Sequence, residues 1–406
     1  MFDFFRDSVD YKTLFLAIVL GLIGVTAVNS ATSNSGMHDF FTRDVVWQLG
    51  GLVVALAIMF SSNRFLQNGA YFYYAITILL LLFVLIAGKK VATHTSWLGF
   101  FGIGGQPSEL AKVASILALS KFLSEKGNER SEWQIIGISA GIVGLPMLLT
   151  FVQPDLGTAV VYLAIFFPIL FWAGMEPLVI AALIAPVAIV FAEFTGTTAL
   201  VLTVISFGVL FFLLGRRKFF AVALSFIAVS FGIFMEYFYR KLLQPHQQKR
   251  IQIFLNPSLD PQGAGYNALQ ARVAIGSGGL LGRGYLHGAQ TQLRFVPARW
   301  TDFIFTVIGE EFGFAGAAIT LLAFAALCFR GIRIAELVKT KFASLASIGI
   351  TSVFLFHVFI NIGMNISLAP IVGIPLPFIS YGGSAILSDW MMVGILLNFY
   401  AHRKEH

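Results

Sequence analysis

The sequence predicts an all-α polytopic membrane protein of about twelve transmembrane helices, and three observations lead to this fold class. Of the 406 residues, 57% are hydrophobic and only 12% are charged, about half the charged fraction of soluble domains. The mean hydropathy is +0.83. Apolar runs close to the roughly 20 residues that span a bilayer recur along the chain. A water-soluble enzyme and a disordered or fibrous chain are therefore excluded.

Twelve apolar windows are the candidate spans. We place them at about 13–31, 45–62, 70–88, 106–123, 132–151, 158–174, 177–194, 197–214, 219–237, 302–329, 342–366 and 384–401. The windows at 158–174 and 177–194 are the shortest and could be tilted or partly re-entrant. Because no internal repeat and no Ser/Gly linker divides the chain, we interpret residues 1–406 as a single integral membrane domain.

The Lys and Arg residues predict the orientation, because cytoplasmic loops carry an excess of them. With the N-terminus inside, fifteen of the 27 basic residues fall on the inner side, and only Arg43, Lys89 and Lys90 fall in short outer loops. We therefore expect both termini in the cytoplasm and the long segment 238–301 outside. The net charge of +7 then reflects topology or lipid phosphates and does not indicate a nucleic-acid partner. The single cysteine, Cys328, excludes a disulfide framework and a thiolate metal cluster.

Charges inside apolar windows are informative, because an ionisable residue at mid-bilayer costs roughly 2.5–3.5 kcal/mol. Glu109 and Lys112 lie three residues apart on a helix expected to start near Pro107. They form either a self-neutralising pair or a charged element that lines a polar cavity. Asp155 follows Pro154 and is well placed to cap the next helix, and the same carboxylate could also face a cavity.

Asp302 opens the span that follows the long segment, where it could be one more helix-capping acid. Small or polar residues share its helix face, and such a stripe would leave a groove below the carboxylate or let another helix approach closely. These residues are Thr306, Gly309, Gly313 and Gly316. Glu310 lies off this stripe but still within the apolar run, as a candidate supporting group of the cavity.

The segment 238–301 contains eight glycines in the 26 residues from Gly263 to Gly288, with arginines around them. Glycine lets backbone N–H groups turn toward an anion, and arginine binds phosphate bidentately. The segment therefore suits a diphosphate group; the alternative is a flexible outer loop whose basic residues meet lipid phosphates. The candidate diphosphate-binding residues are Arg250, Arg272, Arg283 and Arg294.

Three prolines, Pro370, Pro375 and Pro377, precede the last apolar window and cannot continue a helix. Irregular backbone at membrane depth is tolerated only where it is buried in protein or lines a cavity. We therefore favour a re-entrant element here over a plain outer loop.

These segments form an ordered set that resembles the SEDS family (shape, elongation, division and sporulation), and the RodA branch most of all. The resemblance runs from Gln106 to the last span. Its segments are Gln106-Pro107-Ser108-Glu109 with Lys112, Gln153-Pro154-Asp155-Leu156-Gly157-Thr158, Arg250-Ile251-Gln252-Ile253-Phe254-Leu255-Asn256-Pro257, Ala274-Ile275-Gly276-Ser277-Gly278-Gly279-Leu280, Thr301-Asp302-Phe303-Ile304-Phe305 with Glu310-Glu311, and Ser380-Tyr381-Gly382-Gly383-Ser384.

The resemblance implies a peptidoglycan glycosyltransferase that polymerises lipid II during cell elongation and rod-shape maintenance, as a multi-pass protein of the bacterial inner membrane. It also implies a class B penicillin-binding protein, a transpeptidase, as partner. The family's catalytic aspartate matches Asp302, and its other sensitive polar positions match Glu109, Lys112 and Asp155. A lipid II transporter, or flippase, and a non-catalytic scaffold for the penicillin-binding protein are the alternatives.

Two features of the sequence qualify this resemblance. Relatives have about ten spans, so we place a two-span insertion at 197–237, which keeps the segment 238–301 on the same side of the membrane. Pro297-Ala298-Arg299-Trp300 also replaces the commoner Pro-Glu-Arg-His before Thr301. A divalent cation, Mg²⁺ or Mn²⁺, could share the charge of the diphosphate, but no ligand set in the sequence identifies one.

Overall fold

The computed structural model describes residues 9–33, 38–87, 89–91, 94–100, 103–126, 131–195, 197–214 and 264–404, together with residues 230 and 260. The chain forms two compact units. The larger unit comprises Met1–Ile169 and Leu269–His406, and the smaller one comprises Leu170–Ala268. Every polar residue that the sequence singles out and the structure describes lies in the larger unit.

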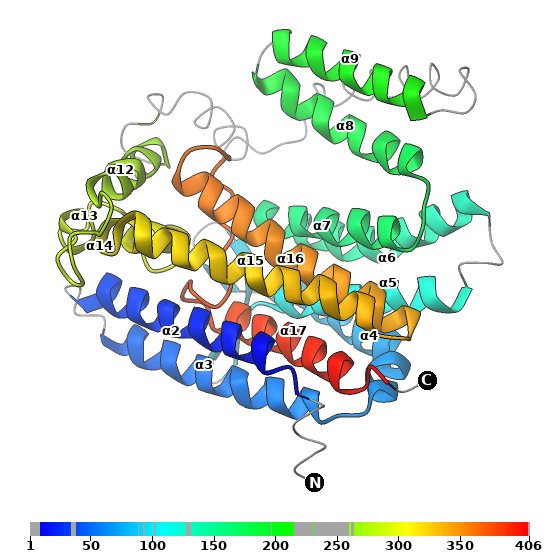
Figure 1. Cartoon of the computed structure of the whole chain (residues 1–406), viewed down its shortest axis with the longest axis horizontal. Helices are drawn as coiled ribbons and strands as arrows, with labels where there is room; N and C mark the ends of the chain where they lie inside the picture. The colour runs from blue at the N-terminus through cyan, green and yellow to red at the C-terminus, as the bar shows by residue number, and fades with distance from the viewer. Residues whose placement is uncertain are drawn as a thin grey trace. The chain divides into compact units, whose positions relative to one another are not determined.

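Long helices make up most of the larger unit (Figure 1). They are α2 (Tyr11–Ser33), α3 (His38–Met59), α4 (Asn63–Ala87), α5 (Pro107–Lys126), α6 (Glu132–Val152), α7 (Leu156–Trp172), α15 (Gly313–Leu337), α16 (Lys341–Asn365) and α17 (Gly383–Ala401). Three shorter helices, α12 (Ala264–Ser277), α13 (Ala289–Gln292) and α14 (Ile304–Glu311), precede α15. The last residues of α7 and the first residues of α12 belong to the smaller unit.

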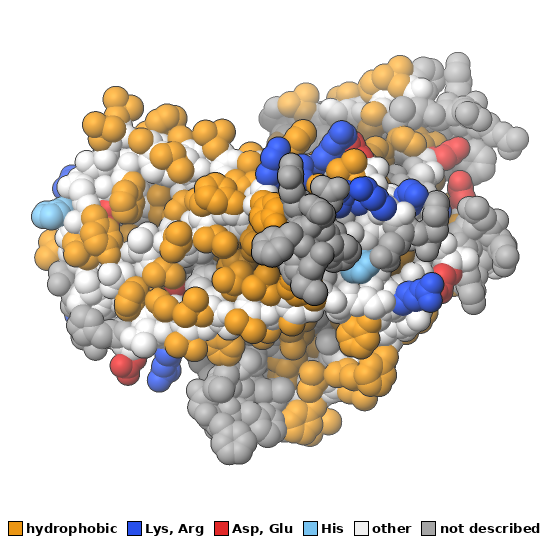
Figure 2. Space-filling view, turned by 60° about the horizontal axis from the view of Figure 1, so that its bottom comes forward, with side chains coloured by type: hydrophobic (Ala, Val, Ile, Leu, Met, Phe, Trp, Pro, Cys, Tyr) orange, Lys and Arg blue, Asp and Glu red, His pale blue; other side chains and the backbone are white. Residues whose placement is uncertain are grey.

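Seven helices of the described residues are long and apolar enough to cross a membrane: α2, α3, α4, α6, α15, α16 and α17. Helix α7 is apolar but shorter. The predicted helical, polytopic fold is confirmed, and most described helices lie within a few residues of their predicted windows, although α3 and α4 begin earlier than predicted. The window at 219–237 lies outside the described residues. Figure 2 shows that hydrophobic side chains cover much of one face of the molecule, as a lipid environment requires.

Local chemistry explains where several helices begin. Helix α5 begins at Pro107, the first-turn position where the missing N–H of proline costs nothing. Helix α16 follows Thr340, whose hydroxyl accepts a hydrogen bond from the Ala343 N–H at 3.4 Å. Helix α6 ends at Val152, just before Pro154.

Contacts between distant segments define two ends of the larger unit. At one end Asp10, before α2, forms an ion pair with Arg330 at 2.8 Å, and Lys339 donates to the Lys404 carbonyl after α17. At the other end Arg299 Nε donates to the Ala31 carbonyl at 2.8 Å. The start of α2 and the end of α17 therefore lie at the same end, which agrees with termini that share one side of the membrane.

One predicted span is wrong as a single helix. The window 302–329 is divided into α14 and α15 at Phe312, and α15 continues to Leu337. Gly313 has φ +63° at the break, and the N–H groups of Phe314 and Ala315 donate to the carbonyls of Gly279 and Leu280 at 2.9 and 3.0 Å. The helix breaks here because residues 279–280 satisfy backbone groups that a continuous helix would have satisfied itself.

Residues 366–382 contain no helix and connect α16 to α17. Phe378 and Ile379 are fully buried, and Gln48 of α3 donates from Nε2 to the Phe378 carbonyl at 2.6 Å. The prediction of irregular backbone buried in protein is confirmed; its depth in the membrane stays a prediction. We call residues 366–382 the irregular segment.

A small antiparallel sheet lies between α4 and α5, which the all-α prediction did not include. It consists of β1 (Lys89–Val91), β2 (His94–Phe100) and β3 (Ile103–Gly105), in the order β1-β2-β3. The strands are too short for a sequence pattern to separate them from a loop.

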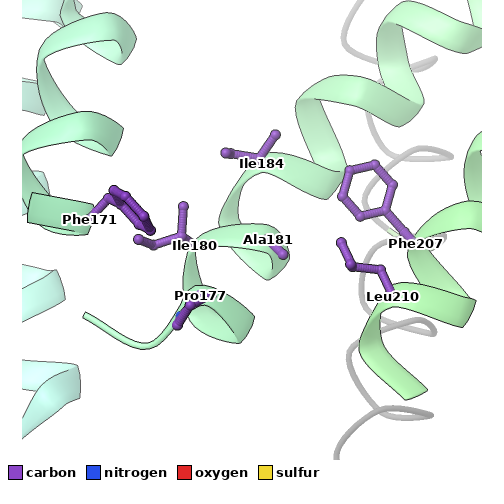
Figure 3. A pocket seen from close by; sticks show the side chains of 7 residues that line it. All are labelled: Phe171, Pro177, Ile180, Ala181, Ile184, Phe207 and Leu210. Atoms are coloured by element: carbon purple, nitrogen blue, oxygen red, sulfur yellow. The ribbon is translucent and has the colours of Figure 1, made fainter. Parts of the chain in front are cut away.

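The smaller unit contains α8 (Pro177–Thr195) and α9 (Thr197–Leu214), which pack through Ala185 and Ile189 of α8. An apolar cavity of about 310 Å³ lies in this unit, as Figure 3 shows. Its lining is Phe171, Pro177, Ile180, Ala181, Ile184, Phe207 and Leu210. None of the predicted polar site residues lines it.

Candidate active site

Asp302 lies in the turn that precedes α14 and is partly exposed. The N-cap of α14 is Phe303, one residue later, and this cap makes no side-chain hydrogen bond. Asp302 therefore does not occupy the N-cap position of α14, and its role stays a prediction. A Cβ at Gly373 would lie 3.4 Å from Asp302 Oδ2, so the carboxylate lies directly against the irregular segment.

Glu109 and Lys112 form a buried ion pair on the first turns of α5. Lys112 Nζ is 2.9 Å from Glu109 Oε2, and both side chains are almost fully buried. Lys112 Nζ also lies 3.2 Å from His357 Nε2 on α16, whose Nδ1 is 3.1 Å from the Pro375 carbonyl oxygen. The pair is thus self-neutralising, as one alternative predicted, and it is also connected through His357 to the irregular segment.

Helix α17 extends this polar network. Ser388 Oγ donates to Glu109 Oε2 at 3.2 Å. The neighbouring Asp389 accepts the backbone N–H of Phe378 at 3.0 Å, and its side chain is buried. Helices α16 and α17 therefore place polar side chains against the irregular segment, and α5 is connected to it through His357.

Asp155 both caps a helix and joins two motifs. Its Oδ1 accepts the N–H of Thr158 at 3.1 Å, the expected bond of an N-cap of α7. Its Oδ2 accepts a hydrogen bond from Gln106 Nε2 at 2.5 Å. The capping prediction is confirmed, and the second bond links the start of α7 to the residue before α5.

Glu310 is fully buried in α14, where its carboxylate receives three hydrogen bonds. The donors are Gln290 N (2.8 Å), Thr291 N (2.9 Å) and Thr291 Oγ1 (2.7 Å). The adjacent Glu311 accepts from Ser30 of α2 at 2.5 Å. These two acids fix α13 and α2 to α14, the helix that follows Asp302.

The predicted diphosphate-binding arginines occupy the exposed surface of α12 and the turns that follow it. Arg272, Arg283 and Arg294 are exposed, whereas Arg250 lies outside the described residues. Arg283 Nε donates to the Ser277 carbonyl at 3.2 Å, and its backbone N–H donates to the Glu310 carbonyl at 3.0 Å. Their role toward a diphosphate stays a prediction.

Arg299, three residues before Asp302, differs from the other arginines because it is buried. Burial, with a smaller contribution from the charge of Arg294, lowers the pKa of Arg299 from its usual value. Its hydrogen bond to the Ala31 carbonyl gives it a structural role.

Among the described residues, no group of three or more His, Cys, Asp or Glu side chains could hold a metal ion. A divalent cation, Mg²⁺ or Mn²⁺, that shares the charge of the diphosphate stays a prediction, and the chemistry proposed below uses none.

A polar stripe on α16 was not predicted from the sequence. His357, Asn361 and Asn365 recur every four residues on an apolar helix, so they share one face. All three side chains are buried, and both asparagines donate to the Asp302 carbonyl. The spacing was a usable signal, because asparagines repeated on one face of a membrane-spanning helix need partners.

Comparisons with known proteins place the chain among related sequences. A family model described as FtsW/RodA/SpoVE, cell cycle protein, matches residues 8–195 and 175–405. The peptidoglycan glycosyltransferase RodA of Treponema pallidum is 33% identical over 97% of this chain and 98% of that protein. The peptidoglycan glycosyltransferase MrdB of Escherichia coli K12 is 32% identical over 98% of this chain and 96% of that protein.

Solved structures show the same fold. A chain from a study of the structural coordination of polymerization and crosslinking by a peptidoglycan synthase complex has a TM-score of 0.76 and 24% identity, over 98% of this chain and 99% of that one. The rod shape determining protein RodA of Thermus thermophilus has a TM-score of 0.64 and 23% identity over the same shares.

The family model covers nearly the whole chain, and the relatives exceed 30% identity over nearly their full lengths. The resemblance seen in the sequence motifs is thereby confirmed. The chain is a multi-pass membrane protein and belongs to the FtsW/RodA/SpoVE family.

Proposed function

We propose that this chain is a RodA-like peptidoglycan glycosyltransferase that polymerises lipid II into glycan strands for cell elongation and rod shape. One observation carries the proposal: the partly exposed Asp302 carboxylate lies against the irregular segment, which buried polar side chains of α16 and α17 also contact, in a chain whose relatives at 32–33% identity are named peptidoglycan glycosyltransferases. Asp302 is the proposed catalytic residue.

In the proposed reaction a GlcNAc 4-hydroxyl attacks the sugar carbon that bears the lipid diphosphate. The new C–O glycosidic bond forms as the bond from that carbon to the phosphate oxygen breaks, and the bonding electrons leave with the diphosphate. Asp302 accepts the hydroxyl proton as general base, which typically contributes 10²–10⁴-fold in rate. A partly exposed carboxylate suits this role, because an acceptor hydroxyl can reach it.

The leaving diphosphate needs positive charge and N–H donors. Arg272, Arg283 and Arg294 are exposed on the segment that runs up to Asp302, and Arg283 is hydrogen-bonded to α14 through its backbone. We assign these arginines, together with Arg250, to the diphosphate. The Glu109–Lys112 pair is connected to the irregular segment through His357, and Asp155 links the start of α7 to Gln106 before α5.

The partner and the membrane follow from the same proposal. The structural neighbour from a complex that coordinates polymerization and crosslinking supports a class B penicillin-binding protein as partner. The proposed location is the bacterial inner membrane with both termini cytoplasmic. Contacts at the start of α2 and the end of α17 support termini on one side, and the excess of Lys and Arg supports the cytoplasm as that side.

Purified protein with labelled lipid II in detergent tests the proposal, because detergent removes the two membrane sides that a transporter requires. We expect glycan chains from the wild type, alone or with its penicillin-binding partner. No glycan in detergent, combined with lipid II movement across liposomes, would replace the enzyme by a transporter. Activity of the partner that rises on binding, without any glycan, would indicate a scaffold.

A further inference from the structure

Three consecutive backbone carbonyls around Asp302 are each held by the C-terminal part of the chain. The Trp300 carbonyl accepts the Tyr381 N–H at 2.8 Å, and the Thr301 carbonyl accepts Ser380 Oγ at 2.7 Å. The Asp302 carbonyl accepts two side-chain amides, from Asn361 at 3.0 Å and from Asn365 at 3.1 Å. The turn that carries the carboxylate is therefore fixed at each peptide unit from outside its own helix.

Among these donors, Asn361 contacts both Asp302 and the irregular segment. Its Nδ2 group also donates to the Ile374 carbonyl at 2.7 Å, so the two N–H bonds of one amide connect Asp302 to the irregular segment. Ile374 follows Gly373, which faces the Asp302 carboxylate. Asn361 thus sets the spacing between the carboxylate and the backbone that lies against it.

Asn365 completes the arrangement. Its Nδ2 donates to the Asp302 carbonyl and, at 2.7 Å, to the carbonyl of Asn361 one turn earlier on α16. Both asparagines are 0% exposed. Burying two amides costs free energy unless they are hydrogen-bonded, and two of their four bonds end on the Asp302 carbonyl.

We propose that Asn361, assisted by Asn365, is a positioning residue for the general base Asp302, an inference that rests on the proposed glycosyltransferase function. General-base transfer needs the carboxylate within hydrogen-bond reach of the attacking hydroxyl. A misplacement of about 1 Å can cost about 10²-fold in rate. The amides hold the backbone at Cα of Asp302 and so restrict where its carboxylate can lie.

Asn361→Asp is the sharpest substitution, because it keeps the shape and replaces both N–H donors by an acceptor that faces two carbonyl oxygens. We expect kcat for glycan formation from lipid II in detergent to fall about ten- to hundredfold, while KM for lipid II changes less than about threefold. Asn365→Ala removes one of the two donors to Asp302 and leaves the Asn361 bridge intact. It should lower kcat only several-fold, and it keeps the proposal testable if Asn361→Asp folds poorly.

Asn398 provides the matched control. It is also 0% exposed, and its Nδ2 donates to the carbonyls of Ile58 and Met59 at the end of α3 and of Ser61 just after it. Asn398→Ala should lower the thermal stability in detergent as much as the Asn361 variant does, yet keep kcat per folded molecule. Equal losses of kcat in both variants would show that Asn361 acts only as a buried amide that stabilises the fold, and would overturn the proposal.

Hydrogen exchange measured by mass spectrometry gives a readout that does not depend on catalysis. Peptides that cover residues 299–306 should exchange faster in Asn361→Asp than in the wild type, and should not change in Asn398→Ala. Unchanged exchange would show that the amides do not hold the turn and would overturn the inference. Faster exchange in Asn361→Asp, together with a wild type that forms no glycan, would instead overturn the proposed function, and the positioning role with it.

Discussion

His357 is held as a neutral imidazole by its two partners. The Pro375 carbonyl near Nδ1 can only accept, so Nδ1 carries the proton. Lys112 near Nε2 can only donate as an ammonium, so Nε2 is the acceptor. The ring thereby connects the Glu109–Lys112 pair to the irregular segment. It fixes the distance between Lys112 and Pro375, which have no other link among the described residues.

A glutamine can reproduce both bonds of His357, because its amide offers one acceptor oxygen and one N–H₂ group. We expect His357→Gln to keep most of the thermal stability in detergent. His357→Leu should lower the free energy of unfolding by about 1–3 kcal/mol, since it leaves buried polar groups of Lys112 and Pro375 unsatisfied. Equal stability of the two variants would show that the network is not held through this residue.

The exposed arginines on the segment before Asp302 give a second prediction about single residues. Loss of one charge-assisted bond to phosphate costs about 1.5–3 kcal/mol, so Arg272→Ala or Arg283→Ala should slow glycan formation roughly ten- to hundredfold at fixed lipid II. Arg333→Ala is the control, because Arg333 is exposed, belongs to α15 and pairs only locally with Glu336 at 2.8 Å. Wild-type rates in both loop variants would remove these arginines from the site.

The elements that carry Asp302 dock through close backbone contacts. A Cβ at Gly278 would lie 2.0 Å from the Gly309 carbonyl oxygen of α14, whereas a Cβ at Gly276 would meet nothing within 4 Å. The small-residue stripe predicted below Asp302 therefore serves close approach of the segment 275–282. A continuous groove, the other prediction, is wrong because the helix breaks at Phe312.

This pair of glycines allows a matched test of the docking. Gly278→Ala should destabilise the protein by about 1–3 kcal/mol, as overpacking does, and should lower glycan formation by displacing α14. Gly276→Ala lies in α12 and should be neutral or slightly stabilising, since alanine favours helix. Thermal unfolding in detergent compares the two. The same melting temperature for both variants would contradict the close contact.

Sequence patterns predict those elements whose causes are local. The apolar runs and their Pro or Asp boundaries place most helices within a few residues, and Asp155 caps α7 as its neighbours indicate. The break at Phe312 could not be predicted, because carbonyls at residues 279–280 cause it. The same holds for Glu310, whose donors lie some twenty residues earlier at Gln290 and Thr291.

The candidate site likewise contains residues that the sequence predicts and residues that it does not. Asp302, Glu109 and Lys112 were identified from their motifs; the structure places Asp302 against the irregular segment and connects the Glu109–Lys112 pair to it through His357. Asn361 and Asn365 were not, since an asparagine on an apolar helix does not say which carbonyl it will meet. Their partner Asp302 is about sixty residues away in the chain.

The two ends of the larger unit hold different sets of contacts. One end holds the Asp10–Arg330 and Lys339–Lys404 contacts, and the other holds the turn of Asp302 with the irregular segment. The excess of Lys and Arg predicts that the first end is cytoplasmic. The site would then open toward the outer leaflet, where lipid II is used.

Cysteine labelling tests this orientation in a Cys328→Ser background. Leu281 is 82% exposed and lies at the site end, so Leu281→Cys should react with an impermeant thiol reagent in intact spheroplasts. Glu336→Cys, on the partly exposed last turn of α15, should react only after lysis. The reverse pattern would invert the topology and with it the side on which the site opens.

The rate of lipid II polymerisation by Asp302→Asn in detergent decides whether Asp302 is the general base. Asparagine keeps the shape but cannot accept the hydroxyl proton, so we expect a loss of about 10²–10⁴-fold with wild-type thermal stability. Asp10→Asn removes a buried carboxylate at the opposite end, where Asp10 pairs with Arg330, and should polymerise normally per folded molecule. Polymerisation by Asp302→Asn at the wild-type rate would contradict the assignment of Asp302 as the general base.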